Sequence, residues 1–211
     1  MNNSTMQNTL EYNTMKLSGK GQVTADPDIA ILRLGVKTNN QNLTDAQTEN
    51  AMISQNVLDT LNQLGITNIK TFQYNIDKIY EFENGKQIDK GYMVTNMLEI
   101  RINDLKQIGN VIDKSVSAGA NIIDLIEFDI SNIEPYYLEA LNLAVMNAYT
   151  KARSISGILG ILINPVPKQI TENTTAPFPP RSFNLREGIA ATPIEPGKKQ
   201  IEANVMVEFI Y

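Results

Sequence analysis

The sequence predicts an α+β protein with largely antiparallel sheets and three main helices packed on one face. Several segments alternate apolar and polar residues with a period of two, as half-buried strands do. Three longer segments repeat apolar residues every three or four positions, which is typical of amphipathic helices. Of the 211 residues, 42% are hydrophobic and 12 are glycine. This is an ordinary content for a globular domain, so the chain can bury a core.

The N-terminal part predicts a leader followed by a hairpin. Residues 1–14 are polar and rich in Asn and Thr, and we expect them to be disordered. Residues 15–23 and 29–37 predict two strands joined by the turn Asp26-Pro27-Asp28, in which proline fixes φ. We expect these two strands to pair with each other.

A capping box begins the first helix. Thr44 and Gln47 have the spacing in which each side chain caps the backbone of the other. Gly65 follows the last apolar position of the helix, where a C′ glycine belongs. Asn50 is the polar exception on the apolar stripe. A helix with one such stripe covers one face of a neighbouring layer.

The next segment predicts a long hairpin. Residues 72–76 and 92–102 both alternate apolar with polar side chains, and Asn84-Gly85 lies between them. Asn-Gly between two alternating segments is a strong hairpin-turn signal. Apolar residues near the tip have no evident core to enter, so we interpret the hairpin as a projection that docks on another copy. The candidate docking residues are Tyr80, Phe82, Ile88 and Tyr92.

A second helix and strand follow. Asp104 and Gln107 open the helix, Gly119 closes it, and residues 126–130 alternate. Gly119 falls opposite Gly65 at an offset of 54 residues, which indicates either an internal duplication or a chance match. On the first interpretation, one domain over residues 15–211 contains two related strand-helix-strand halves, about 15–103 and 104–211.

The C-terminal part predicts a long helix, a loop and a closing strand. Glu134-Pro135 starts the helix, with proline at the tolerated first position, and the helix runs to about Ile158. Residues 171–197 hold five of the nine prolines and predict a flexible loop. Residues 201–209 alternate and must pair with a strand far back in the sequence. Small residues recur every four positions along the helix and form a ridge that admits another backbone: Ala140, Ala144, Ala148, Ala152 and Ser156.

Composition excludes several kinds of site and partner. The chain has no His and no Cys, which excludes thiol nucleophiles, His-assisted triads, Cys/His zinc sites and disulfides. A net charge of −5 without a dense Lys/Arg cluster argues against nucleic acid and against anionic membrane surfaces. The longest apolar stretch, Ile158 to Ile163, is far shorter than the roughly 20 residues of a membrane-spanning helix. We therefore expect no cofactor, no direct membrane insertion and no enzymatic activity.

Two motifs remain as candidates for chemistry. Gly19-Lys20-Gly21 precedes a strand and not the helix that a phosphate-binding loop requires, so a bulge or a close backbone crossing explains it better. Asp124, Glu127 and Asp129 crowd one strand, with Glu127 and Asp129 pointing the same way. Paired carboxylates can bind a hard cation. Their alternation with apolar residues is more typical of a solvated strand face, so binding of a divalent cation or small ligand is the alternative function.

The main functional hypothesis is self-assembly. The projecting hairpin, the alanine ridge and the strand after the long loop each offer a surface to another copy of the chain. The N-terminus lacks the basic start and apolar segment of a signal peptide. We therefore expect a cytoplasmic homo-oligomer, or a periplasmic or other extracytoplasmic one if an export signal has been removed.

Short motifs between Leu17 and Phe209 occur in a recognisable order, among them Gly19-Lys-Gly21-Gln-Val23, Leu64-Gly65-Ile66, Gly91-Tyr92-Met-Val94-Thr-Asn96, Ala118-Gly119-Ala120-Asn121 and Pro193-Ile194-Glu-Pro196-Gly197. In these motifs the sequence resembles the SIMPL-domain family, which includes the YggE-like and periplasmic immunogenic proteins. The resemblance implies an α+β fold of two related halves. It also implies ring- or channel-like oligomers in the cell envelope for some members and a link to oxidative-stress tolerance for others. It supplies no catalytic residues.

Overall fold

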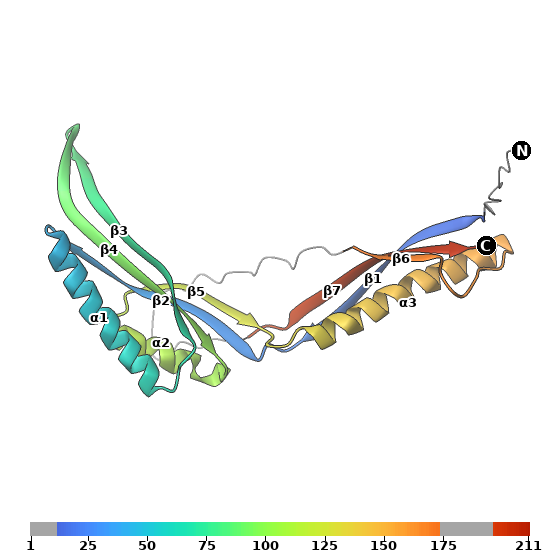
Figure 1. Cartoon of the computed structure of the whole chain (residues 1–211), viewed down its shortest axis with the longest axis horizontal. Coiled ribbons are helices and arrows are strands. Elements are labelled where there is room, and N and C mark those ends of the chain that lie inside the picture. The colour runs from blue at the N-terminus through green and yellow to red at the C-terminus, as the bar shows by residue number, and fades with distance from the viewer. Residues whose placement is uncertain (1–11, 174–195) are drawn as a thin grey trace, which may run out of the picture. The chain divides into compact units, whose positions relative to one another are not determined.

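A computed structural model describes residues 12–173 and 196–211, and Figure 1 shows its elements. In chain order these are β1 (Thr14–Ala25), β2 (Ile29–Asn40), α1 (Leu43–Gln63), β3 (Ile69–Glu83), β4 (Lys86–Ile102), the short 3-10 helix η1 (Leu105–Gln107), α2 (Ile108–Ser117), β5 (Ile122–Asp129), α3 (Glu134–Leu159), β6 (Gln169–Glu172) and β7 (Lys199–Ile210). The strands form two antiparallel sheets, which confirms the α+β class. Most of the predicted leader and of the predicted 171–197 loop lies outside the described residues.

The chain divides into two compact units, each with its own sheet and its own helices. Unit 1 contains β1, α3, β6 and β7, with strand order β1-β7-β6. Unit 2 contains β2 to β5 with α1 and α2, and its strand order is β3-β4-β2-β5. Unit 1 thus combines the first strand of the chain with its C-terminal part. The boundary expected near residues 103 and 104 lies inside unit 2, between β4 and α2.

The predicted hairpin between residues 15–23 and 29–37 is wrong. β1 pairs over its whole length with β7, from Thr14 opposite Ile210 to Ala25 opposite Lys199. β2 lies between β4 and β5, so both of its edges are already paired. The turn at 26–28 therefore leads from one unit into the other. The expectation that residues 201–209 pair with a distant strand is confirmed.

Close packing in unit 1 explains both the glycine pair and the alanine ridge. Ala140, Ala144, Ala148 and Ala152 of α3 are fully buried. A Cβ atom on Gly19 would collide with the carbonyl oxygen of Ala144, and one on Gly21 with that of Ala140. Only glycine lets the helix backbone come this close. The glycines mark a close backbone crossing, and the ridge is filled within the chain and is not left for a second copy.

Unit 2 has the β-α-β-β-α-β arrangement of ferredoxin-like folds. Its two strand-helix-strand segments, β2-α1-β3 and β4-α2-β5, interleave in one sheet, and both lie between residues 29 and 129. These segments contain the match seen at the 54-residue offset. The two helices end alike, since the Ile66 N–H donates to the Leu61 carbonyl at 3.0 Å and the Ala120 N–H to the Ser115 carbonyl at 2.9 Å.

The polar exception on the first helix ties α1 to the sheet. Asn50 is fully buried. Its side-chain amide donates to the carbonyl of Val36 in β2 at 3.0 Å and to that of Val94 in β4 at 3.1 Å. A buried amide with such partners is satisfied and fixes the position of the helix over the sheet.

The N-terminal cap of α1 differs from the prediction. The helix begins at Leu43, and the side chain of Asn42 accepts the Thr44 N–H at 2.8 Å. The capping box predicted on Thr44 and Gln47 is therefore wrong. Asn is as good a cap as Thr, and it stands two residues earlier. The helix end predicted at Gly65 is confirmed by its φ of +78°.

Candidate docking surface on the β3–β4 hairpin

The candidate surface is the part of the β3–β4 hairpin that extends past the rest of unit 2. The last pair between β2 and β4 joins Asn40 and Tyr92, whereas β3 and β4 stay paired as far as Glu83 and Lys86. We call residues 79–91 the hairpin arm. Among the described residues it is a two-stranded ribbon, and Figure 1 shows it reaching beyond the start of α1.

A two-residue turn closes the arm. Asn84 has a φ of +51° and Gly85 a φ of +77°. A type I′ turn needs positive φ at both central residues, and its twist matches that of the flanking strands. The hairpin predicted from Asn84-Gly85 is therefore confirmed.

Gly91 fixes the base of the arm. Its φ is +92°, and a Cβ there would collide with the carbonyl oxygen of Asn40 at the end of β2. Lys90 beside it is the extra residue of a β-bulge, because β3 has no partner for it. The carboxylate of Asp89 accepts the Gly91 N–H at 2.8 Å. Since bulges bend and twist a ribbon, these residues set the direction in which the arm leaves the sheet.

One face of the arm is aromatic. Tyr80 pairs with Asp89 and Lys78 with Tyr92, so these four side chains share a face, and Phe82 joins them two positions beyond Tyr80. Phe82 is 73% exposed and Tyr80 is 46% exposed. We call Tyr80 and Phe82 of the arm, together with Tyr92 next to its base, the aromatic face.

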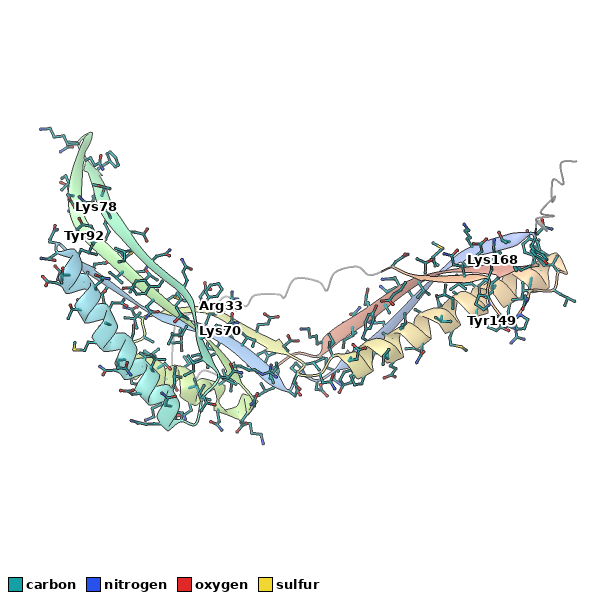
Figure 2. The ribbon with its side chains drawn as sticks, in the orientation of Figure 1. Arg33, Lys70, Lys78, Tyr92, Tyr149 and Lys168 are labelled. Carbon is teal, nitrogen blue, oxygen red and sulfur yellow. The ribbon has the colours of Figure 1, made fainter. Side chains whose placement is uncertain are left out.

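Lys78 organises the aromatic face at its base. Its Nζ lies 2.8 Å from a carboxylate oxygen of Asp89, 5.5 Å from the ring centre of Tyr80 and 5.6 Å from that of Tyr92. Figure 2 shows Lys78 and Tyr92 close together there. The hydrogen bond from Lys78 and that from the Gly91 N–H hold the pKa of Asp89 below its usual value. The same pair raises the pKa of Lys78.

Ile88 lies on the opposite face of the arm. It pairs with Glu81, which alternates with Tyr80 and Phe82. This second face carries charge, since the Lys90 ammonium lies 2.7 Å from Glu81 and 3.7 Å from Glu83. The four docking residues predicted from the sequence therefore divide into three on the aromatic face and Ile88 on the charged face.

The sequence missed the exposure of the part of β3 that precedes the arm. Phe72, Tyr74 and Ile76 were expected on a half-buried strand, yet all three are exposed. β3 is the outer strand of its sheet, so in the described part of the chain it has a neighbouring strand on one side only. An exposed apolar edge strand is a template for pairing with another chain. Alternation alone cannot reveal edge position, because that depends on the order of the strands.

The acidic candidates lie on β5. Glu127 is opposite Ile31 and Asp129 opposite Ile29, so these two carboxylates share a face as expected. Asp124 is the extra residue of a bulge in β5. Within residues 12–173 and 196–211, no group of three or more acidic side chains is arranged to hold a metal ion. The geometry therefore gives the cation-binding alternative no support.

The fold and the arm define an α+β protein made of two sheet-and-helix units, with an exposed hairpin arm on the second. Comparison with known sequences gives its family. Residues 15–209 match the SIMPL family, described as "Protein of unknown function (DUF541)", and the chain belongs to this family. The resemblance found in the sequence is thereby confirmed.

Curated relatives match most of the chain. The 26 kDa periplasmic immunogenic protein of Brucella melitensis is 31% identical over 180 residues, which are 82% of this chain and 72% of that protein. The uncharacterized protein YggE of Escherichia coli is 27% identical over 154 residues, which are 71% of this chain and 61% of that protein. YggE of Edwardsiella ictaluri is 28% identical over 155 residues. None of these names is that of an enzyme.

Proposed function

We propose that this chain is a non-enzymatic protein that assembles with copies of itself through the hairpin arm. The observation that carries the proposal is the exposure of Phe82 and Tyr80 on one face of an ordered ribbon. Large aromatic side chains are frequent anchors of protein interfaces, because they bury much apolar area for few rotatable bonds.

The backbone of the arm offers a second means of contact. β3 is an outer strand along its whole length, and among the described residues β4 has β3 as its only neighbour over the arm. Each strand of the arm therefore has one edge without a described partner strand. A strand of a second copy can add its hydrogen bonds to such an edge while the aromatic face supplies side-chain contacts.

The ion pairs of the arm favour docking indirectly. Lys78 with Asp89 and Lys90 with Glu81 join the two strands across the ribbon. Exposed ion pairs add little to stability. They do restrict the conformations of a free ribbon, and a surface that is already ordered loses less entropy on binding.

The test is the mass of the full chain in solution. Size-exclusion chromatography with light scattering should give a mass well above 23.5 kDa for the unaltered protein. Phe82→Asp should return the mass to that of one chain, because it places a charge at the most exposed ring of the aromatic face. Met52→Asp is the matched control, since Met52 is 62% exposed on α1, away from the arm.

Two results would contradict the proposal. An unaltered chain that stays at 23.5 kDa at high concentration excludes self-assembly. An assembly whose mass Phe82→Asp leaves unchanged excludes the aromatic face as its interface. Ile88→Asp distinguishes the two faces of the arm, because it should weaken assembly less than Phe82→Asp does. Circular dichroism of each variant establishes that the fold is retained.

We also propose that the protein acts outside the cytoplasm, in the cell envelope. The support is the name of the Brucella relatives, which are called periplasmic. The expectation of a cytoplasmic location depended on the N-terminal pattern alone, and the comparisons give it no support. Immunodetection of the natural protein in periplasmic extract tests the proposal, and its recovery in the cytoplasmic fraction alone would contradict it.

A further inference from the structure

The end of α3 carries apolar side chains on the outside of unit 1. The longest apolar stretch of the sequence, 158–163, belongs to this end. Leu162 is 93% exposed, Ile158 is 83% exposed, and Leu159 and Val166 are also exposed. We call Ile158, Leu159, Leu162 and Val166 the apolar tip. An apolar segment of this kind normally lies in a core, so its exposure on the surface indicates a contact with a partner.

The backbone that carries the tip is fixed. Gly160, with a φ of +66°, ends the helix. The Asn164 N–H then donates to the Ile210 carbonyl, and the Lys168 N–H to the Glu208 carbonyl, both at 2.8 Å. These bonds join the loop after α3 to β7. The exposed side chains therefore project from an ordered scaffold and not from a frayed helix end.

The charges around the tip are basic. Residues 140–171 contain no Asp or Glu, and their charged side chains are those of Lys151, Arg153 and Lys168. Glu208 lies nearby on β7, where it pairs with Lys168 at 3.2 Å and with Lys16 at 3.7 Å. Figure 2 shows Lys168 at this end of the unit. The net charge of these five residues is therefore positive, although the whole chain carries a net charge of −5.

We propose that the apolar tip inserts into the headgroup region of an anionic lipid bilayer, and that the positive charge of the nearby Lys and Arg side chains attracts the lipid phosphates. Apolar side chains beside basic residues are the pattern of proteins that lie on a membrane surface. None of the helices in the described residues is long and apolar enough to span a membrane, and surface contact requires none. The net charge that argued against anionic membranes describes the chain as a whole, whereas the tip is locally basic.

The tip is small, with four exposed apolar side chains. A few aliphatic side chains are sufficient for reversible contact with a bilayer when electrostatic attraction assists them. This inference is independent of the self-assembly proposed for the hairpin arm.

Tryptophan fluorescence gives a direct test, because the chain contains no Trp. Leu162→Trp of the full chain places a single fluorophore in the tip. Its emission should shift to shorter wavelength with vesicles of phosphatidylcholine and phosphatidylglycerol, and less with vesicles of phosphatidylcholine alone. Met52→Trp, at an exposed site on α1, should show no shift with either.

Flotation of the same vesicles measures binding without a probe. The unaltered chain should float with the anionic vesicles, and both Leu162→Asp and the milder Leu162→Ser should reduce the bound fraction. Arg153→Glu should reduce binding to anionic vesicles as well. Failure of the unaltered chain to float overturns the proposal, and so does equal binding by the Leu162 variants. A fall in the solution mass of Leu162→Asp assigns the tip to an interface between copies and overturns it too, whereas a loss of mass confined to Phe82→Asp concerns the arm alone.

Discussion

The alanine ridge of α3 and the aromatic face of the hairpin arm are both suited to close contact, yet among the described residues only the ridge is covered by its own chain. The ridge residues Ala140 and Ala144 are fully buried against Gly19 and Gly21 of β1. Phe82 on the arm is mostly exposed. The ridge therefore contributes to the fold of unit 1, while Phe82 stays exposed among the described residues.

The difference lies in whether the chain supplies a complement. Small residues recur every four positions on the helix and every two positions on the strand, so the helix backbone fits against the strand. In the sequence, Gly19 and Gly21 on either side of Lys20 were the signal that another backbone packs closely against this strand. The aromatic face has no such complement among the described residues of unit 2.

Breaking the ridge contact should give the largest effect. Gly21→Val places a branched side chain against the carbonyl oxygen of Ala140, and we expect unit 1 to lose about 4 kcal/mol or more of stability. Gln22→Val is the matched control, because Gln22 is the exposed next residue on the same strand. Hydrogen exchange followed by mass spectrometry should show faster exchange in β1 and β7 for Gly21→Val only. Equal exchange in the two variants would contradict the close crossing.

Local features of the fold could be predicted from the sequence, whereas strand partners could not. Asn84-Gly85, Gly65 and Gly119 each specify a backbone conformation at one place, and all three have the positive φ that such positions need. Alternation identifies a strand and its two faces but not its neighbour. For this reason β1 was wrongly paired with β2.

The next largest loss of stability is expected from a substitution at the base of the arm. Gly91 and Gly85 both have positive φ, but an added Cβ meets Asn40 and Gln41 only at Gly91 and has open space at Gly85. Gly91→Ala should therefore cost about 2–3 kcal/mol of stability, through strain and collision together. Gly85→Ala should cost about 1 kcal/mol, through strain alone. Chemical denaturation of both variants measures the difference. Equal losses would show that β2 does not hold the base of the arm.

If the arm mediates assembly, the two variants should also differ in solution mass. Gly91→Ala changes the direction of the arm and should weaken assembly. Gly85→Ala alters the turn at the end of the arm and leaves its direction unchanged.

The smallest effect is expected at acidic pH, where the Asp89 carboxylate becomes protonated. Its pKa is lowered by Lys78 and by the Gly91 N–H. The stability that these bonds contribute is therefore present at a pH above the pKa of the unfolded chain, and it is lost as the pH falls through the pKa of the folded chain. The Gly91 amide resonance should therefore titrate with a midpoint below 3.8, the ordinary value of Asp. Asp89→Asn should abolish this transition. A midpoint at or above 3.8 would mean that the ion pair does not persist in solution and that the arm is ordered by its turn and its bulge alone.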